Sequence, residues 1–170
     1  MSNIKVLINE EKLQKRVKEL AKKIENDYKE KDINLVCILK GSIFFTCDLA
    51  KNIGKNVKID FLRIASYDKE NSGKINLVAN LLPSIKNKDI IIIEDIIDTG
   101  KTLNYLVPLL EKENPKSIKV CTLLDKPARR EVDFKADYVG FEIEDKFIVG
   151  YGLDYDQDYR NLPYIGYIEK

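Results

Sequence analysis

The feature that most constrains the fold is a run of four isoleucines, residues 90–93, that leads directly into a polar turn. β-branched residues favour strands, and an apolar run without alternating polar residues is typical of a strand buried on both faces of a parallel sheet. Segments 35–39, 57–64 and 118–124, which are rich in apolar residues, also predict strands. Segments with helical spacing separate them, which predicts an α/β fold with a mainly parallel central sheet flanked by helices.

Helices are expected where apolar residues recur every three or four positions. They are predicted over 13–24, 44–53 and about 102–112. Asn9 is placed to cap the first of them, and Pro108 should kink the third because proline removes a helical hydrogen bond. An alternating run over 4–8 predicts a short strand at the N-terminus, and the chain beyond Val132 is rich in short strand-like segments, glycine and tyrosine.

Composition excludes several kinds of chemistry. The chain contains no histidine, which rules out Ser-His-Asp triads and histidine-based zinc or iron sites. Acid and base chemistry must therefore use Asp, Glu, Lys, Tyr or Cys, and a metal site should be built from oxygen ligands that suit Mg²⁺, Mn²⁺ or Ca²⁺. The 29 Lys and Arg against 28 Asp and Glu leave a net charge of +1, which does not favour nucleic-acid binding.

Cysteine use and the N-terminus point to the cytoplasm. Cys37, Cys47 and Cys121 show no CxxC spacing, and small buried thiols in a reducing compartment explain them. The first twelve residues are too polar for a signal peptide, and the longest aliphatic run is far shorter than the roughly 20 residues that cross a bilayer. We therefore expect a cytoplasmic protein with no membrane contact.

The segment 94–102 carries the strongest chemical signal. In parallel sheets, ligands bind beyond the carboxyl ends of the strands, which here precede segments 40–42, 94–102 and 125–130. Glu94 and Asp95 can accept hydrogen bonds from a vicinal diol or hold hydrated Mg²⁺, while the start of a helix near Gly100 suits a phosphate. Together they fit a ribose 5-phosphate.

Two other interpretations of this segment are weaker. A P-loop would need glycine at position 95, and the aspartate that stands there would repel nucleotide phosphates. A capped helix with solvated charges would explain a lone Asp-Thr-Gly, but it does not explain the whole string.

The same segment resembles a known signature. Glu94-Asp-Ile-Ile-Asp98-Thr-Gly-Lys-Thr102 matches the phosphoribosyl-pyrophosphate (PRPP) motif of type I phosphoribosyltransferases. Further segments narrow the resemblance to the bacterial hypoxanthine-guanine phosphoribosyltransferases. They are the pyrophosphate loop at 39–42, the purine-recognition strand at 123–127, and the C-terminal hood at 144–155 and 160–164. The resemblance covers nearly the whole chain, with its segments in the family's order.

The resemblance implies a fold and a reaction. The fold would be that of a type I phosphoribosyltransferase, as a single domain over 1–170 with a core over about 10–140 and a small hood over about 1–9 and 141–170. The reaction would be purine salvage, in which PRPP and hypoxanthine or guanine give IMP or GMP and pyrophosphate, with Mg²⁺ as cofactor. The family also implies a homodimer or homotetramer.

The resemblance also assigns roles to individual residues. Asp98 would be the general base and would face the purine N7. The phosphoribosyl group would be bound by Glu94, Asp95, Asp98, Thr99, Gly100, Lys101 and Thr102. Pyrophosphate would be bound by Lys40, Gly41 and Arg160, and in this family the peptide bond before this glycine is often cis. The purine site would be formed by Lys126, Phe147, Ile148, Val149 and Asp154, with Lys126 donating to the 6-oxo group and Phe147 stacking on the base. Metal ions would be held by Glu94, Asp95 and Asp154.

Some features depart from the family pattern or leave more than one interpretation open. The expected lid, which begins at Ser66 and Tyr67 and continues over 68–74, is about two residues short, and the stretch after it lacks the usual lysine and aspartate. Arg129 and Arg130 fit either a solvated pair or a subunit contact. Lys126 could be a surface lysine, Phe147 a core aromatic, and Asp154 with Arg160 a structural ion pair.

Two other functions stay open at this point. One is a xanthine- or pyrimidine-preferring phosphoribosyltransferase, because Lys126 and Phe147 do not rank the oxopurines. The other is a regulator of the same fold that senses PRPP and binds RNA or DNA, which would need a basic face that the net charge does not suggest.

Overall fold

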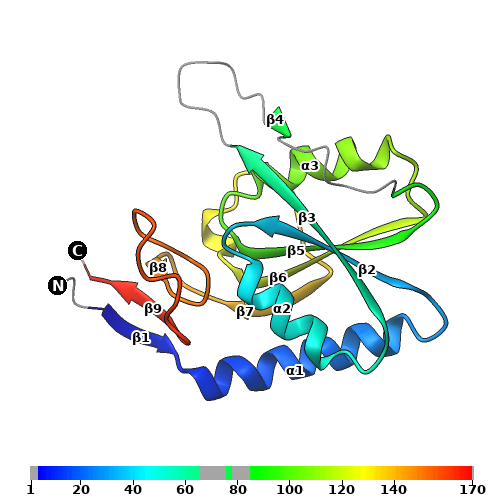
Figure 1. The fold of residues 1–170 in the computed structure, drawn as a ribbon. Helices are drawn as coiled ribbons and strands as arrows, with labels where there is room; N and C mark the ends of the chain where they lie inside the picture. The colour runs from blue at the N-terminus through cyan, green and yellow to red at the C-terminus, as the bar shows by residue number, and fades with distance from the viewer. Residues whose placement is uncertain (1–3, 66–75, 78–84, 170) are drawn as a thin grey trace.

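A computed structural model describes residues 4–65, 76–77 and 85–169 (Figure 1). The expected lid at Ser66, Tyr67 and 68–74 lies outside these residues. The strands are β1 (Ile4–Ile8), β2 (Ile33–Leu39), β3 (Val57–Ala65), β4 (Asn76–Leu77), β5 (Asp89–Ile97), β6 (Ser117–Asp125), β7 (Tyr138–Glu142), β8 (Phe147–Val149) and β9 (Ile165–Ile168). The helices are α1 (Glu10–Asp27), α2 (Ile43–Asn52) and α3 (Lys101–Glu111), with a short 3₁₀ helix over Pro127–Arg129.

The central sheet has the strand order β4-β3-β2-β5-β6-β7. Its five long strands are parallel, and β4 pairs antiparallel with β3. A second, antiparallel sheet has the order β1-β9-β8, so the two ends of the chain lie side by side (Figure 1). The predicted α/β fold, with a mainly parallel central sheet flanked by helices, is confirmed.

The isoleucine run in β5 is buried on both faces, as predicted. Ile91 and Ile93 pack in the core cluster that also contains the buried faces of α1 and α2. Ile90 and Ile92 pack in a second cluster with α3 on the other side of the sheet. Because side chains alternate along a strand, one apolar run supplies both cores, and helices cover both faces of the sheet (Figure 1).

The three predicted helices are present as α1, α2 and α3. The Asn9 side chain accepts a hydrogen bond from the backbone amide of Lys12 at 2.9 Å, which caps α1 as predicted. In α3 the helix continues through Pro108, whose missing N–H leaves the carbonyl of the exposed Asn104 without its helical donor. Cys37 and Cys121 are buried and Cys47 is exposed, and all three are free thiols. No helix in the described ranges combines the length and the hydrophobicity needed to span a membrane.

Candidate active site

Three chain segments meet at the carboxyl edge of the central sheet. β5 lies between β2 and β6 and is parallel to both, so the ends of all three strands lie on the same side (Figure 1). Strand β5 is longer than the apolar run that predicted it, since its ladder with β6 continues to Ile97 opposite Asp125. Glu94 and Asp95 are therefore strand residues rather than turn residues, and the strand holds them rigidly.

The turn after β5 prepares the start of α3 for an anion. We call residues 98–102 the phosphate loop. Gly100 has φ +82°, a left-handed conformation that favours glycine, and a Cβ there would lie 2.9 Å from Cδ of Arg130. The N-cap Gly100 has no side chain to cap α3, and the first helical amide, that of Lys101, donates to Oγ1 of Thr99 at 3.4 Å, so the following amides and the positive end of the dipole are available to a ligand. The Lys101 side chain turns away to an exposed ion pair with Glu131.

Glu94 and Asp95 form a half-buried pair of carboxyl groups. Burial raises the pKa of both groups, and the neighbouring Asp95 charge raises the pKa of Glu94 further. The Arg160 charge acts in the opposite direction on Asp95, which also accepts a hydrogen bond from the amide of Ile96 at 2.7 Å. Two adjacent carboxyl groups of this kind can accept hydrogen bonds from hydroxyl groups or bind a hard cation.

Gly41 lies against Asp95. A Cβ on Gly41 would overlap Oδ2 of Asp95, and a Cβ on Gly152 would overlap the carbonyl oxygen of Gly41. Three segments distant in sequence therefore pack tightly here, Gly41 against the Asp95 side chain and Gly152 against the Gly41 backbone, and glycine is required at both positions. The cis peptide bond of this loop joins Leu39 to Lys40, one bond earlier than the bond before Gly41 that the family resemblance suggested.

Lys40, Asp154 and Arg160 meet around one amide side chain. Oε1 of Gln157 accepts from Lys40 Nζ at 3.0 Å and from Arg160 Nη2 at 3.4 Å. Arg160 also pairs with Asp154 at 2.8 Å and donates to the Gly152 carbonyl at 2.7 Å. The expected pyrophosphate-binding cations thus lie close together, and the structural ion pair between Asp154 and Arg160 is present as well.

A cavity of about 740 Å³ brings Asp98, Lys126 and Phe147 together. Lys126 is 6% exposed, so it is not a surface lysine, and its Nζ donates to the Lys146 carbonyl at 2.7 Å. Phe147 is 42% exposed, which is not the environment of a core aromatic, and its ring meets Tyr155 edge to face at 5.3 Å. A planar heterocycle with polar edges fits these surroundings.

Not every expected purine-site residue lines this cavity. The side chains of Ile148 and Val149 are buried in β8, where Ile148 belongs to the core. Asp154 is held by Arg160 instead. Of Ile148 and Val149, only the backbone can take part in ligand contacts there, whereas the exposed Phe147 side chain of the same strand lines the cavity.

Three further polar residues of the site carried little or no signal in the sequence. Arg129 Nε donates to Oδ1 of Asp98 at 3.0 Å, and Asp145 faces Lys126 at 3.3 Å. Both line the cavity. Gln157 joins the pyrophosphate corner from a loop with no distinctive motif. The position of Arg129 and Arg130 just after a strand end was the only feature of the sequence that suggested a role in the site. Both arginines form specific contacts with Asp98 rather than a solvated pair.

The expected metal ligands lie in two places. Glu94 and Asp95 are adjacent on β5, whereas Asp154 lies in the loop after β8. Across the described residues, no group of three or more acidic, cysteine or histidine side chains gathers as a metal site. Mg²⁺ commonly binds through one or two carboxylates, waters and substrate phosphates, so the pair on β5 fits such an ion without a third protein ligand.

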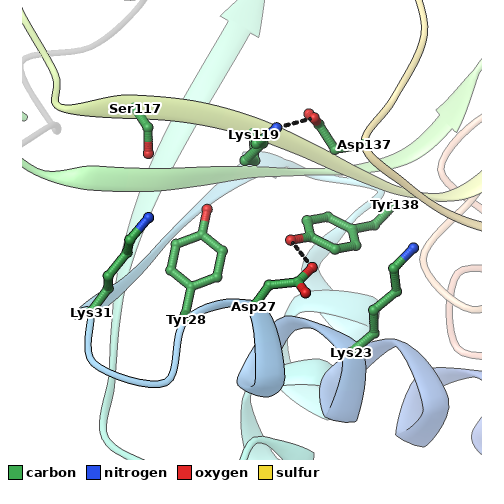
Figure 2. A pocket seen from close by; sticks show the side chains of 8 residues that line it. All are labelled: Lys23, Asp27, Tyr28, Lys31, Ser117, Lys119, Asp137 and Tyr138. Atoms are coloured by element: carbon green, nitrogen blue, oxygen red, sulfur yellow. Dashed lines mark hydrogen bonds and ion pairs between the residues drawn. The ribbon is translucent and has the colours of Figure 1, made fainter.

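A second cavity lies at the opposite, amino edge of the sheet (Figure 2). It is lined by Lys23, Asp27, Tyr28, Lys31, Ser117, Lys119, Asp137 and Tyr138, and its volume is about 330 Å³. Tyr138 donates to Asp27 at 2.8 Å and Lys119 pairs with Asp137 at 2.7 Å, as Figure 2 shows. Burial raises the pKa of Tyr28 to about 12, so this phenol is neutral at physiological pH. Because four of the lining side chains, Tyr138 with Asp27 and Lys119 with Asp137, are already paired with one another, we assign this cavity a structural role.

That role makes a stability prediction. Replacing Tyr138 with phenylalanine removes its hydrogen bond to Asp27 and should lower the free energy of unfolding by about 1 kcal/mol. Because Asp27 is exposed, water replaces the lost donor and limits the cost. A thermal melt should show a Tm lower by about 2–4 °C, with enzyme kinetics unchanged. An unchanged Tm would show that the bond does not contribute to stability.

The comparisons with known proteins agree with this geometry. Residues 5–156 match the model of the phosphoribosyl transferase domain. Because that match covers most of the chain, the protein belongs to the phosphoribosyl transferase domain family.

Within the family, the similar proteins include enzymes that are named for the purines hypoxanthine and guanine. The hypoxanthine-guanine phosphoribosyltransferase of Bacillus subtilis is 48% identical over 97% of this chain and 93% of its own length. A crystal structure of a hypoxanthine-guanine phosphoribosyltransferase from Bacillus anthracis superimposes with a TM-score of 0.93 at 48% identity, covering 98% of this chain and 100% of that one. A variant hypoxanthine phosphoribosyltransferase from Trypanosoma cruzi, in a ternary substrates complex, gives a TM-score of 0.93 at 37% identity, covering 99% of this chain and 96% of that one.

Proposed function

We propose that the protein transfers the 5-phosphoribosyl group of PRPP to N9 of hypoxanthine or guanine in purine salvage. The bond from N9 to the ribose C1′ forms, the bond from C1′ to pyrophosphate breaks, and the products are IMP or GMP with pyrophosphate. The observation that carries this proposal is the cavity that places Asp98, Lys126 and Phe147 beside the phosphate loop. The 48% identity to the Bacillus subtilis enzyme over nearly the full length supports it independently.

The phosphoribosyl group would be held from two sides. The amides at the start of α3 and the hydroxyls of Thr99 and Thr102 would bind the 5-phosphate, where a helix N-terminus favours negative charge. The carboxyl groups of Glu94 and Asp95 would accept hydrogen bonds from the ribose hydroxyls. Holding both ends of the sugar would fix C1′ relative to the purine, and such positioning of two bound reactants can account for a large part of the rate enhancement.

The base would be recognised by its 6-oxo edge. The Lys126 ammonium has three N–H donors. Two of them point to the Lys146 carbonyl and to Asp145, so the third is available to a purine carbonyl oxygen. Adenine presents a 6-amino donor to the same cation and would be rejected. The exposed face of Phe147 would stack on the ring.

Asp98 would act on the N7 edge of the purine. Its carboxylate lines the same cavity as Lys126, and Arg129 holds one of its oxygens at 3.0 Å. One carboxylate oxygen thus has a fixed partner, and the other would accept the N7 proton as the ring becomes nucleophilic.

The leaving pyrophosphate would be received by Lys40, Gly41 and Arg160. The two cations already converge on Gln157 at 3.0 and 3.4 Å, and Gly41 permits a close backbone approach. We further propose that Mg²⁺ is held by Glu94 and Asp95 together with PRPP, and that Asp154 supports a second ion. Bound Mg²⁺ would supply neutralisation of the charge that builds up on pyrophosphate.

We also infer the state in which the protein acts. Residues 1–170 would form a single domain, with the small β1-β9-β8 sheet as its hood. Exposed apolar side chains on α2 and β3, Ile43, Phe44, Ile59 and Phe61, support association as a homodimer or homotetramer. Free thiols support a cytoplasmic location.

A panel of bases tests the proposed substrate class. The wild-type protein, PRPP and Mg²⁺ would be incubated with hypoxanthine, guanine, xanthine, adenine or uracil, and pyrophosphate release would be measured. Release with hypoxanthine or guanine, and not with adenine, supports the proposal. Release only with xanthine or uracil would keep the phosphoribosyl chemistry and reject the assigned bases, whereas salt-sensitive RNA binding without release would favour a regulator.

The role of Lys126 makes a sharper prediction. Lys126→Met should lower kcat/KM for hypoxanthine by about tenfold, because one hydrogen bond to a charged group contributes about 1.5 kcal/mol. The KM for PRPP should change by less than about twofold. Lys119→Met, on strand β6 that ends just before Lys126 but in the opposite cavity, is the matched control and should leave both constants unchanged. A variant at Lys126 with wild-type hypoxanthine kinetics would contradict the role.

A further inference from the structure

The segment that follows the 3₁₀ helix binds the backbone of the phosphate loop. Arg130 Nη1 donates to the carbonyl oxygen of Asp98 at 2.8 Å. The next residue, Glu131, donates its amide to the carbonyl of Thr99 at 3.0 Å. Two consecutive carbonyls of the phosphate loop are therefore turned toward residues 130 and 131.

These contacts determine where the loop amides point. In a trans peptide the C=O and the N–H of the following residue point in opposite directions. The only cis bond among the described residues is Leu39–Lys40, so both loop peptides are trans. The amides of Thr99 and Gly100 consequently point away from Arg130 and Glu131. No protein group within the described ranges accepts a hydrogen bond from either amide.

Arg130 is itself firmly placed. Its side chain is 15% exposed and forms an ion pair through Nη2 with Asp125, the last residue of β6, whose side chain is 12% exposed. Its Cδ lies close to where a Cβ of Gly100 would stand. One guanidinium thus joins the end of β6, next to Lys126, to the loop after β5. A planar group with two separate donor directions suits this task, and a lysine cannot reproduce it.

We propose that Arg130 is the positioning residue of the phosphate loop: by holding the Asp98 carbonyl, it directs the Thr99 amide toward the 5-phosphate of PRPP and of the nucleotide product. The inference rests on the proposed function and adds a residue to it. Arg129 holds the side chain of Asp98, while Arg130 holds its main chain. The two adjacent arginines would therefore position the general base and the phosphate-binding amide separately.

The test compares two ligands that differ only in the phosphate. The dissociation constants of inosine and IMP would be measured by titration calorimetry. The ratio of the inosine constant to the IMP constant isolates the contribution of the 5-phosphate to binding. Arg130→Met should reduce this ratio by about tenfold, since losing one hydrogen bond to an anion costs about 1.5 kcal/mol. The affinity for inosine itself should change by less than about twofold, which a general loss of structure would not produce.

Arg16→Met is the matched control. Arg16 also clamps backbone carbonyls, those of Gly140 at 2.7 Å and Val139 at 2.9 Å, but between α1 and β7. Its ratio should match that of the wild type. If Arg130→Met does not fold, Arg130→Lys takes its place, and the same ratio should fall.

An unchanged ratio, or an equal fall in Arg16→Met, would overturn the positioning role and leave the proposed function intact. A wild-type protein that binds inosine and IMP equally would overturn the proposed function and this inference with it.

Discussion

Replacing Asp98 with asparagine is expected to lower kcat for IMP formation by about 10²- to 10⁴-fold, the usual contribution of a positioned general base. Asparagine has nearly the same shape, and its amide oxygen can still accept from Arg129, whose Nε lies 3.0 Å from Oδ1 of Asp98. The phosphate loop, which Arg130 holds through the main chain, should also keep its geometry. The loss should therefore appear in kcat, with the KM for PRPP within about threefold of the wild type.

The matched control for this variant is Asp145→Asn. Asp145 is a second carboxylate of the same cavity and also faces Arg129, at 3.7 Å. Its replacement should reduce kcat by less than about tenfold, because it has no proposed contact with the reacting atoms. Steady-state kinetics with hypoxanthine would measure both. If Asp98→Asn kept more than a third of the wild-type kcat, Asp98 would not be the base.

Replacing Gly41 with alanine should reduce kcat/KM for PRPP by about 100-fold. The added Cβ would overlap Oδ2 of Asp95, so either the loop at Lys40 or the strand carboxylate must move. A displacement of about 1 Å in a site that aligns two substrates can cost about 100-fold in rate. Overpacking of this kind also costs about 1–3 kcal/mol of stability, so a melt should accompany the kinetics.

Gly54→Ala provides the comparison. A Cβ at Gly54 would lie 3.3 Å from the carboxylate of Glu25, the flexible end of a half-buried side chain, and it should be tolerated. The kinetic loss should thus be specific to position 41. Wild-type PRPP kinetics in a folded Gly41→Ala protein would show that the tight packing against Asp95 has no functional importance.

Local sequence patterns determine much of this fold. The isoleucine run predicts a strand buried on both faces because no polar side chain interrupts it, and Ile90 to Ile93 divide between the two cores as expected. Asn9 predicts its helix start because the cap is a contact between residues three apart. The end of β5 was less predictable. Glu94 and Asp95 resemble turn residues, yet pairing with β6 extends the strand to Ile97.

The site is predictable where a motif is contiguous and less so where it depends on contacts between distant segments. Asp98, Lys126 and Phe147 come from three motifs and meet in one cavity, as the resemblance suggested. The contact of Gln157 with Lys40 joins residues that are 117 positions apart in the sequence, and no local pattern encodes it. The different tasks of Arg129 and Arg130 likewise depend on side-chain direction, which adjacent identical residues do not reveal.

The most direct test of the central claim is a single reaction. Wild-type protein would be incubated with PRPP, hypoxanthine and Mg²⁺, and both IMP and pyrophosphate would be quantified over time. We expect equal amounts of the two products, formed only when all three components are present. Pyrophosphate without IMP would mean that PRPP is hydrolysed rather than transferred. Neither product, with hypoxanthine or with guanine, would contradict the proposed function.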